Sequence, residues 1–283
     1  MTNRQGQTGG ARCRLDVSQQ EHLRHLLSQQ DFWTLARIAQ LVQDSFHFSY
    51  SHQGLRQLLK RMNLYYYKPQ PRDYRQSPLA QEQLQQRLRA TVDGLTLRAE
   101  SLSQLAFGFA DEFAPQLHQN RARLWSLWPG KHRSVNTNRV SQSTFGFYAL
   151  QGQSIVEFMV NGKADTIKTM LQSVRTVNPT AHRIVLIWDN ARSHLDQQVQ
   201  RFAWQLGIYL VALPPYSPNL NPIERIWKSI RYRLSQVGLI DSVTSLQVQI
   251  KAIFEELSQS HSFAKSWIEQ LLNPLYELSP VLA

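Results

Sequence analysis

The chain has 283 residues, 42% of them hydrophobic, which is enough apolar material for a buried core and excludes a globally disordered protein. Lysine and arginine outnumber aspartate and glutamate by 31 to 20, and the net charge of +11 fits a nucleic-acid partner or an ordinary basic surface. With a single cysteine, Cys13, the chain can form neither an internal disulfide nor a cysteine-based zinc site. It has no bilayer-crossing apolar run and no secretory signal, so we expect a cytoplasmic protein with no membrane partner.

The first part of the chain has the pattern of a small helical domain. Residues 1–14 are polar and glycine-rich, and we interpret them as a flexible tail. From there to Met62 the apolar residues follow a helical period, which predicts three short helices. Thr34 and Ser51 stand where the caps of the second and third helices belong. With a short β-wing or an extended arm after the last helix, residues 15–68 are predicted to form a helix-turn-helix or winged-helix DNA-binding domain.

The third predicted helix is basic on its exposed side, and residues 56–75, which begin in this helix, contain six basic residues and one acid, a balance that favours DNA binding. In a helix-turn-helix, side chains early in this helix reach base edges and those in its last turn bind phosphates. The alternative is a generic three-helix bundle whose exposed face happens to be basic. The candidate DNA-contacting residues are His52, Gln53, Arg56, Gln57, Lys60 and Arg61.

The pattern changes after this domain. Residues 69–100 begin with a segment rich in Pro, Arg and Gln and continue as a polar helix, which predicts a linker and a connecting helix. Over residues 101–283 strand-like and helical patterns alternate, which predicts an α/β domain with helices on both faces of a sheet. The predicted strands are 105–113, 144–150, 154–160, 183–188 and 208–213; the predicted helices are 165–177 and 193–206, with two or three more between 221 and 272.

Three acidic residues stand at predicted strand and helix ends. Asp111 lies near the end of the strand LAFGFADEF, Asp189 follows the buried strand RIVLIW, and Glu224 lies in the first turn of a later helix. Carboxylate oxygens are the ligands that Mg²⁺ and Mn²⁺ prefer. The three acids therefore suggest a metal site. Glu112 competes with Asp111 as the first acid, and because adjacent strand residues point to opposite faces, only one of them faces the site.

Each acid also has a purely structural interpretation. Asp189 is placed to accept hydrogen bonds from its own loop, and Asp111 with Glu112 fits a solvated strand end. Residues 221–224 have the spacing of an N-cap, a first-turn proline and a capping-box glutamate. Glu224 also stands four residues before a lysine with which it can pair. Taken singly, the acids leave these alternatives open.

The motifs around the acids are more specific. The segments IWDNARSH (187–194) and LPPYSPNLNPIERIW (213–227) closely resemble the catalytic core of the mariner superfamily of cut-and-paste transposases, above all its bacterial insertion-sequence branch. In that family a strand ends in Asp-Asn-Ala-x-x-His, and a Pro-Pro-Tyr-Ser-Pro-x-Leu-Asn-Pro-Ile-Glu loop brings the last acid. Here 34 residues, 190–223, separate Asp189 from Glu224, a spacing typical of the family. Upstream, the first acid and WSLWPGK (125–131) resemble the family more loosely.

This resemblance, over roughly residues 30 to 235, implies an RNase H-like core, a mixed sheet flanked by helices, in a DDE transposase that cuts transposon ends and joins them to target DNA. It implies that Asp111, Asp189 and Glu224 are catalytic and bind two Mg²⁺ or Mn²⁺ ions, with the aspartates bridging the pair and Glu224 completing the second site. Two such ions serve the attacking and leaving oxygens of a phosphodiester. The implied partners are double-stranded DNA, as terminal inverted repeats and target, and a second copy of the chain at the nucleoid.

Polar and basic residues near the acids are further candidates. Asn190, Arg192 and His194 lie within one turn of Asp189 and either support it or contact phosphate, with a surface role as the alternative. The stretch 120–140 holds several basic residues and no acid, which predicts a DNA-backbone surface or a solvated basic loop. The candidates in that stretch are Arg121, Arg123, Lys131 and Arg133.

The resemblance also defines the functional alternatives. Relatives usually carry another helix-turn-helix module upstream, and too few residues precede Leu15 to form one. We therefore expect the product of a second reading frame or a decayed copy, with weakened end recognition. The main alternative function is a catalytically silent helix-turn-helix protein, such as a repressor or a domesticated remnant. A stand-alone RNase H-like nuclease is a third possibility, against which the attached DNA-binding module argues.

Overall fold

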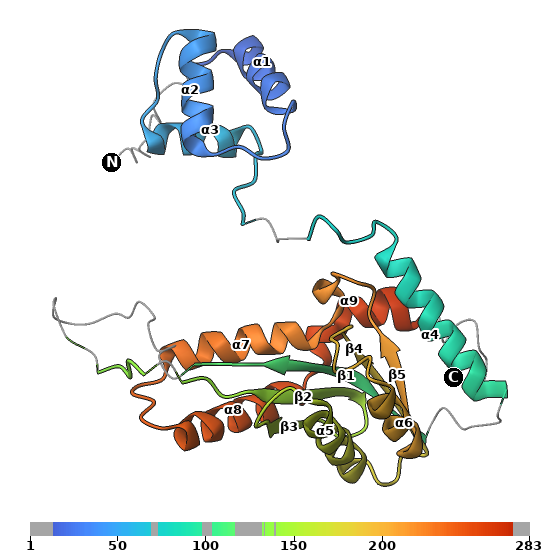
Figure 1. Cartoon of the computed structure of the whole chain (residues 1–283). Coiled ribbons are helices and arrows are strands. Elements are labelled where there is room, and N and C mark those ends of the chain that lie inside the picture. Colours follow the sequence, from blue (N-terminus) through green and yellow to red (C-terminus); the bar gives the residue numbers. More distant parts are fainter. Residues whose placement is uncertain are drawn as a thin grey trace, which may run out of the picture. The chain divides into compact units, whose positions relative to one another are not determined.

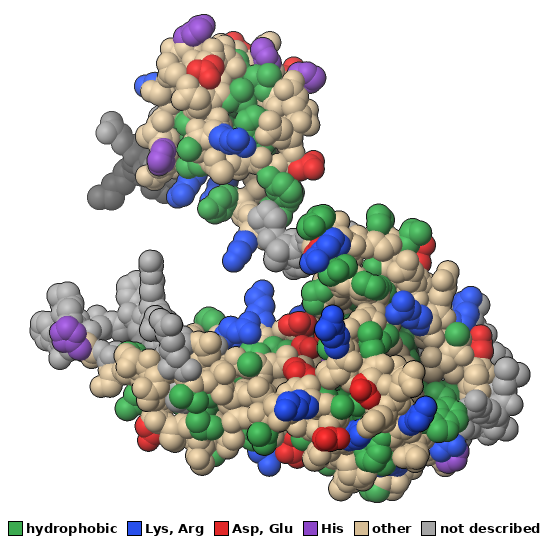
Figure 2. All heavy atoms as spheres, viewed as in Figure 1, with side chains coloured by type: hydrophobic (Ala, Val, Ile, Leu, Met, Phe, Trp, Pro, Cys, Tyr) green, Lys and Arg blue, Asp and Glu red, His purple; other side chains and the backbone are tan. Residues whose placement is uncertain are grey.

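The computed structural model describes residues 14–68, 73–97, 104–116, 132, 134–138 and 140–273. The chain divides into two compact units, Met1–Pro71 and Arg72–Ala283, which are described separately. On the face drawn in Figure 2, Lys and Arg side chains project from both units, interspersed with Asp and Glu. Among the described residues, no helix is long and apolar enough to cross a membrane.

The first unit contains three short helices, α1 (Val17–Leu27), α2 (Leu35–Phe46) and α3 (His52–Arg61) (Figure 1). The side chains of Thr34 and Ser51 accept the backbone N–H groups of Arg37 and Gly54, so both predicted caps are confirmed. The first helix begins at Val17, because Asp16 and Gln19 form a reciprocal capping box just before it.

One side of each helix closes a small apolar core. Leu23, Val42, Leu55 and Leu58 are completely buried there. The opposite side of α3 is open to solvent and basic in its last turn. Residues 64–68 follow α3 without forming a strand, so within this described stretch the arm alternative holds and the β-wing alternative does not.

The second unit is built on a five-stranded mixed sheet with the strand order β3-β2-β1-β4-β5. The central strand β1 runs antiparallel to β2 and parallel to β4, and β4 runs parallel to β5. The strands are β1 (Leu105–Phe113), β2 (Thr144–Gln151), β3 (Ile155–Phe158), β4 (Arg183–Trp188) and β5 (Ile208–Ala212). The bounds of β1 and β4 are those that the sequence predicts.

The alternation of side chains along the strands creates two apolar layers. Leu105, Phe109 and Phe113 of β1 face α4 (Ala80–Leu97), α7 (Ile223–Gln236) and α8 (Val243–Ser258). Ala106 and Ala110 of the same strand face the other layer, formed by α5 (Ala164–Val177) and α6 (Gln197–Gln205). Figure 1 shows the sheet between α7 and α5. The predicted RNase H-like fold, a mixed sheet flanked by helices with a helix-turn-helix unit before it, is confirmed.

One helix begins later than the sequence predicts. The helix predicted from Ser193 begins at Gln197, because residues 192–195 form a turn and Asp196 then caps the helix by accepting the N–H groups of Gln198 and Val199. The helices predicted between residues 221 and 272 are present as α7 and α8, and shorter helical pieces follow them. These are η3 (His261–Ala264), α9 (Lys265–Trp267) and the single π-turn η4 (Ile268–Leu272).

Candidate active site

Strand register brings the first two acids to the same edge of the sheet. In the parallel pair of β1 and β4, Phe109 lies opposite Ile187. Asp111, still within β1, and Asp189, directly after β4, each follow two residues later, so they lie at the same level of the sheet. The carboxyl edge of parallel strands is where α/β proteins usually place their ligands.

Glu224 reaches this edge through the loop that follows β5. Leu213 N–H donates to the carbonyl of Trp188 over 2.8 Å, and Asn190 Nδ2 donates to the carbonyl of Leu213 over 2.5 Å. At the end of the loop, Asn221 Nδ2 donates to the carbonyl of Ala110 over 3.2 Å. Hydrogen bonds to both acid-bearing strands therefore fix where α7 begins.

The capping-box interpretation of Glu224 is wrong. Helix α7 has Pro222 at its N-cap position and no side-chain cap. The side chain of Asn221, which the spacing assigns to the cap, is buried and bonds to β1 instead. Because Glu224 is not needed to complete a cap, its carboxylate is left to face the pocket.

The three acids line one cavity of about 470 Å³. Asp189 and Glu224 are exposed, whereas Asp111 is half-buried and accepts a hydrogen bond from Trp227 Nε1 over 3.0 Å. Glu112, the competing first acid, does not line this cavity. The other residues that line it are Asn190, Ala191, Leu213, Pro214, Pro215, Tyr216, Ser217, Pro218 and Asn221.

The electrostatics of the cavity favour a cation. Burial, followed by the negative charges of Glu224 and Asp189, raises the pKa of Asp111 to about 8, against which the hydrogen bond from Trp227 acts. Burial also raises the pKa of Glu224; Arg231 opposes that rise and Asp189 adds to it. Three oxygen-donor carboxylates that repel one another fit a hard divalent ion in charge and in chemistry. As they stand, however, no three His, Cys, Asp or Glu side chains of the described residues are close enough to hold one.

Asp189 is held by a buried histidine. Nδ1 of His194 lies 2.7 Å from Oδ1 of Asp189, and that oxygen also accepts the N–H of Ala191 over 2.9 Å. The His194 ring is 3% exposed and stacks on Trp188, with ring centroids 4.0 Å apart. The hydrogen bond from His194 is the main reason that the pKa of Asp189 lies below its usual range. Both contacts use Oδ1, which leaves Oδ2 as the oxygen available to a ligand.

Glu112 approaches the other side of the same histidine. Its Oε1 lies 3.4 Å from Nε2 of His194. Burial lowers the pKa of His194, but Asp189 and Glu112 together outweigh that effect and raise the pKa to about 9. The sequence presents Glu112 only as a rival of Asp111. The structure gives the two residues different neighbours, because they point to opposite faces of β1.

Residues 107–247 match the family model of the DDE superfamily endonucleases, and residues 29–87 match that of the winged helix-turn-helix. The chain belongs to the DDE superfamily endonucleases. The prediction of a DDE-type, DNA-cutting enzyme is thereby confirmed. Assignment to the bacterial insertion-sequence branch stays a prediction. No curated protein sequence matches the endonuclease significantly.

Three solved structures of similar fold are Mos1 paired-end complexes. The chain is similar to the Mos1 transposase paired-end complex with left transposon end, with a TM-score of 0.61, 15% identity, and coverage of 95% of this chain and 81% of the other. It is also similar to the Mos1 paired-end complex with Mg, with a TM-score of 0.59, 16% identity, and coverage of 98% and 79%. The corresponding complex with Mn has a TM-score of 0.59 and 14% identity, with coverage of 95% of this chain and 81% of the other. At these identities the likeness establishes the fold.

The remaining predicted residues of the endonuclease fall into two groups. All six candidates on α3 are exposed, and so is Arg192 beside Asp189. The second group lies outside the described residues together with the segment WSLWPGK. Its members are Arg121, Arg123, Lys131 and Arg133.

Two residues of the site have roles that the sequence does not reveal. Trp227 has the spacing of a core residue of α7, and it is indeed buried, but its Nε1 also donates to Asp111. Asn221 has the position of a helix cap and instead joins α7 to β1. The first is signalled by the preference of a buried tryptophan N–H for a partner. The second has no local signal, because Ala110 is 111 residues away.

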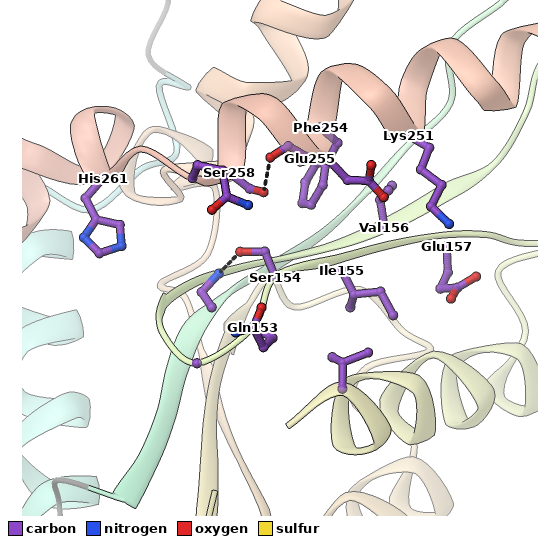
Figure 3. A pocket seen from close by; sticks show the side chains of 14 residues that line it. Gln153, Ser154, Ile155, Val156, Glu157, Lys251, Phe254, Glu255, Ser258 and His261 are labelled. Carbon is purple, nitrogen blue, oxygen red and sulfur yellow. Dashed lines mark hydrogen bonds between the residues drawn. The ribbon is translucent and has the colours of Figure 1, made fainter. Parts of the chain in front are cut away.

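A second cavity of about 460 Å³ lies between the β2–β3 hairpin and α8 (Figure 3). Glu157 and Lys251 face each other across it, and Ser154 accepts the backbone N–H of Ala149 over 3.0 Å. None of the acids at the β1–β4 edge lines this cavity. It is therefore separate from the candidate active site.

Proposed function

We propose that this endonuclease is a DNA transposase, which hydrolyses phosphodiester bonds at transposon ends and joins the freed 3′-hydroxyl groups to target DNA. The observation that carries the proposal is the meeting of Asp111, Asp189 and Glu224 around one cavity at the edge of β1 and β4. An exposed basic helix in the unit that precedes this core supplies a surface for DNA.

The three acids are proposed as catalytic residues and as the ligands of two Mg²⁺ or Mn²⁺ ions. When bound, such ions activate the attacking oxygen of a phosphodiester hydrolysis and stabilise the leaving oxygen. Mg and Mn also appear in the Mos1 complexes that share this fold, which supports the choice of metal. To serve as ligands, the carboxylates need to converge further than they do here, and the free Oδ2 of Asp189 is the oxygen to do so.

Neighbouring residues of the chain hold the carboxylates of Asp111 and Asp189 and the loop that leads to Glu224. Trp227 orients Asp111 through its indole N–H. His194, supported by its stack on Trp188 and by Glu112, fixes one oxygen of Asp189 and favours its ionised form. Asn190 ties the loop after β5 to β4 and so bounds the cavity. Water and then a DNA 3′-hydroxyl are the proposed nucleophiles, so the mechanism needs no covalent intermediate on a side chain.

The DNA partners follow from the two units. We propose that His52, Gln53, Arg56 and Gln57 read bases of the terminal inverted repeats and that Lys60 and Arg61 bind phosphates, because all six project from one exposed helix. Arg121, Arg123, Lys131 and Arg133 are proposed to follow the DNA backbone near the acids. Because a transposon has two ends, a homodimer is the proposed assembly, acting at the nucleoid in the cytoplasm. A Mos1 strand transfer complex among the structures of similar fold supports the joining step.

The direct test compares the wild-type protein with Asp189→Asn. We would measure nicking of supercoiled plasmid, and of DNA that carries the element's flanking repeats, with Mg²⁺, with Mn²⁺ and with neither. Cleavage that requires metal and disappears in Asp189→Asn supports the transposase. Binding of DNA without cleavage under any of these conditions would leave a catalytically silent DNA-binding protein instead.

A further inference from the structure

The short segment from Asp73 to Gln76, here called the 73–76 segment, lies directly after the boundary between the two units. Hydrogen bonds and an ion pair within the segment fold it into a turn. Asp73 Oδ1 accepts the backbone N–H of Arg75 over 2.9 Å, and the carbonyl of Asp73 accepts that of Gln76 over 3.0 Å. The Arg75 guanidinium forms a two-point ion pair with the Asp73 carboxylate, at 3.0 and 2.8 Å. The segment is therefore a preorganised turn rather than a plain spacer.

This turn binds the loop that leads to Glu224. Gln76 is 7% exposed, although its side chain is polar. Its Nε2 donates to Ser217 Oγ over 3.0 Å and to Asn219 Oδ1 over 2.8 Å. The Arg75 guanidinium lies 3.8 Å from the centroid of the Tyr216 ring, a close cation–π contact.

The loop at this point is one that needs external support. Tyr216 has a backbone φ of 57°, in the left-handed region that bulky side chains rarely occupy. Such a strained conformation persists only where several surrounding contacts hold it in place. Ser217, the next residue, is 3% exposed and its hydroxyl also donates to the carbonyl of Pro215 over 3.1 Å. Removing the Gln76 amide would leave the buried Ser217 hydroxyl oxygen without that donor.

The same loop forms one wall of the acid-lined cavity and ends where α7 begins. Tyr216, Ser217 and Pro218 line that cavity together with Glu224. We infer that Arg75 and Gln76 are positioning residues that hold the loop carrying Glu224, so that the segment joining the DNA-binding unit to the catalytic unit also shapes the metal-binding pocket. This inference rests on the proposed function in that it takes the pocket to be the metal site.

The inference is tested on the full-length protein with Mn²⁺ as the probe. Mn²⁺ affinity is measured by isothermal titration calorimetry, and backbone hydrogen exchange is followed in peptides covering residues 213–224. The variants are Gln76→Ala and Arg75→Met, the latter at an exposed position. Gln81→Ala, at an exposed glutamine of α4 that is outside the 73–76 segment, is the matched control, and Asp189→Asn reports whether the titration detects the acid-lined pocket.

We expect Gln76→Ala to weaken Mn²⁺ binding about 3- to 10-fold and Arg75→Met about 2- to 3-fold, with faster exchange across 213–224 and an unchanged melting temperature for Arg75→Met. Gln81→Ala should match the wild type in both measurements. Wild-type affinity and exchange in both segment variants would overturn the inference while leaving the proposed function standing. If the wild type bound no Mn²⁺, or Asp189→Asn bound it equally well, the metal pocket itself would fail, and the inference with it.

Discussion

The two units of the endonuclease present their functional residues in different ways. In the first unit, the candidate DNA contacts stand on the outer face of α3, and the inner face of the same helix closes the core. In the second, the three acids come from two strand ends and a helix start, held by contacts that join residues over a hundred positions apart. The helical period alone determines which side chains of α3 face solvent, whereas the acid-lined cavity exists only when the whole sheet has formed.

Asp189→Asn is expected to have the largest effect, because it should abolish cleavage in the second unit and leave DNA binding by the first unit intact. The substitution keeps the shape of the side chain and removes the charge that a divalent ion requires. Cleavage of repeat-bearing DNA should fall by about 1,000-fold or more, roughly 4 kcal/mol of transition-state stabilisation. Binding of the same DNA, measured by fluorescence anisotropy, should stay within about 2-fold of the wild type. Loss of DNA binding together with cleavage would show that the two units do not act separately.

The next effect concerns the support of that carboxylate. In His194→Asn the ring that lies between Asp189 and Glu112 is lost, so Asp189 keeps the Ala191 N–H but loses its histidine partner, and no imidazole separates the two carboxylates. We expect cleavage to fall about 10- to 100-fold, in the range found when a residue that orients a metal ligand is removed. Plasmid-nicking rates across a range of Mn²⁺ concentrations would show part of the loss recovered at high Mn²⁺.

The control for this change is His261→Asn, because His261 is exposed on a short 3₁₀ turn and does not line the acid cavity. Its nicking rate should equal that of the wild type. Full activity in His194→Asn at every Mn²⁺ concentration would reduce the stacked histidine to a packing residue.

What could be predicted from the sequence follows the same division. Helix caps at Thr34 and Ser51, and the strands LAFGFADEF and RIVLIW, are set by local propensity and by alternation, so their positions were predicted correctly. The α/β class follows from the order of these elements. The three acids can be identified as candidates only by the motifs around them and by their spacing. Taken singly, each acid has a local structural explanation that is equally good.

The contacts that hold the acids could not be predicted, because they are long-range. The bond from Asn221 to Ala110 replaced a local capping box that the spacing favours. The approach of Glu112 to His194, and of Gln76 to Ser217, depends on the strand order and on the path of the loop after β5. No pattern within a few residues encodes either, since their partners are brought together by the sheet.

A smaller and selective effect is expected on DNA binding from α3. Arg56→Ala removes a candidate base contact, and we expect about a 10-fold loss of affinity for the terminal repeat, with weaker discrimination against unrelated DNA. Lys60→Ala removes a candidate phosphate contact and should weaken binding to both DNAs alike, lowering the salt dependence by about one ion. Anisotropy titrations at several salt concentrations measure both quantities.

Lys168→Ala serves as the charge control, because it removes one positive charge from α5 in the other unit. It should change affinity little. Metal-dependent nicking of plasmid without repeats should persist in Arg56→Ala, since the acids are untouched. Equal affinity of Arg56→Ala and wild type for the repeat would move end recognition away from α3.

The smallest effect is on stability. It measures how much stability the catalytic unit loses by holding its acids close together. Asp111 is held near Glu224 and Asp189, and its pKa of about 8 lies well above the ordinary value of 3.8. A carboxyl group whose folded pKa is raised destabilises the fold as the pH rises above its unfolded pKa, and the penalty stops growing once the pH passes the folded pKa. From about pH 4 to pH 8, the metal-free protein is therefore progressively weakened by this residue.

Asp111→Asn should raise the metal-free melting temperature at pH 8 by a few degrees while abolishing cleavage, because the amide keeps an acceptor for Trp227 without a charge. The gain should shrink toward pH 4, and added Mn²⁺ should stabilise the wild type and not the variant. Thermal melts followed by circular dichroism measure this, with Asp165→Asn, at an exposed acid of α5, as the control. A lower melting temperature in Asp111→Asn would mean that its charge is balanced within the fold, and the contrast with the first unit would then lie only in how the residues are held.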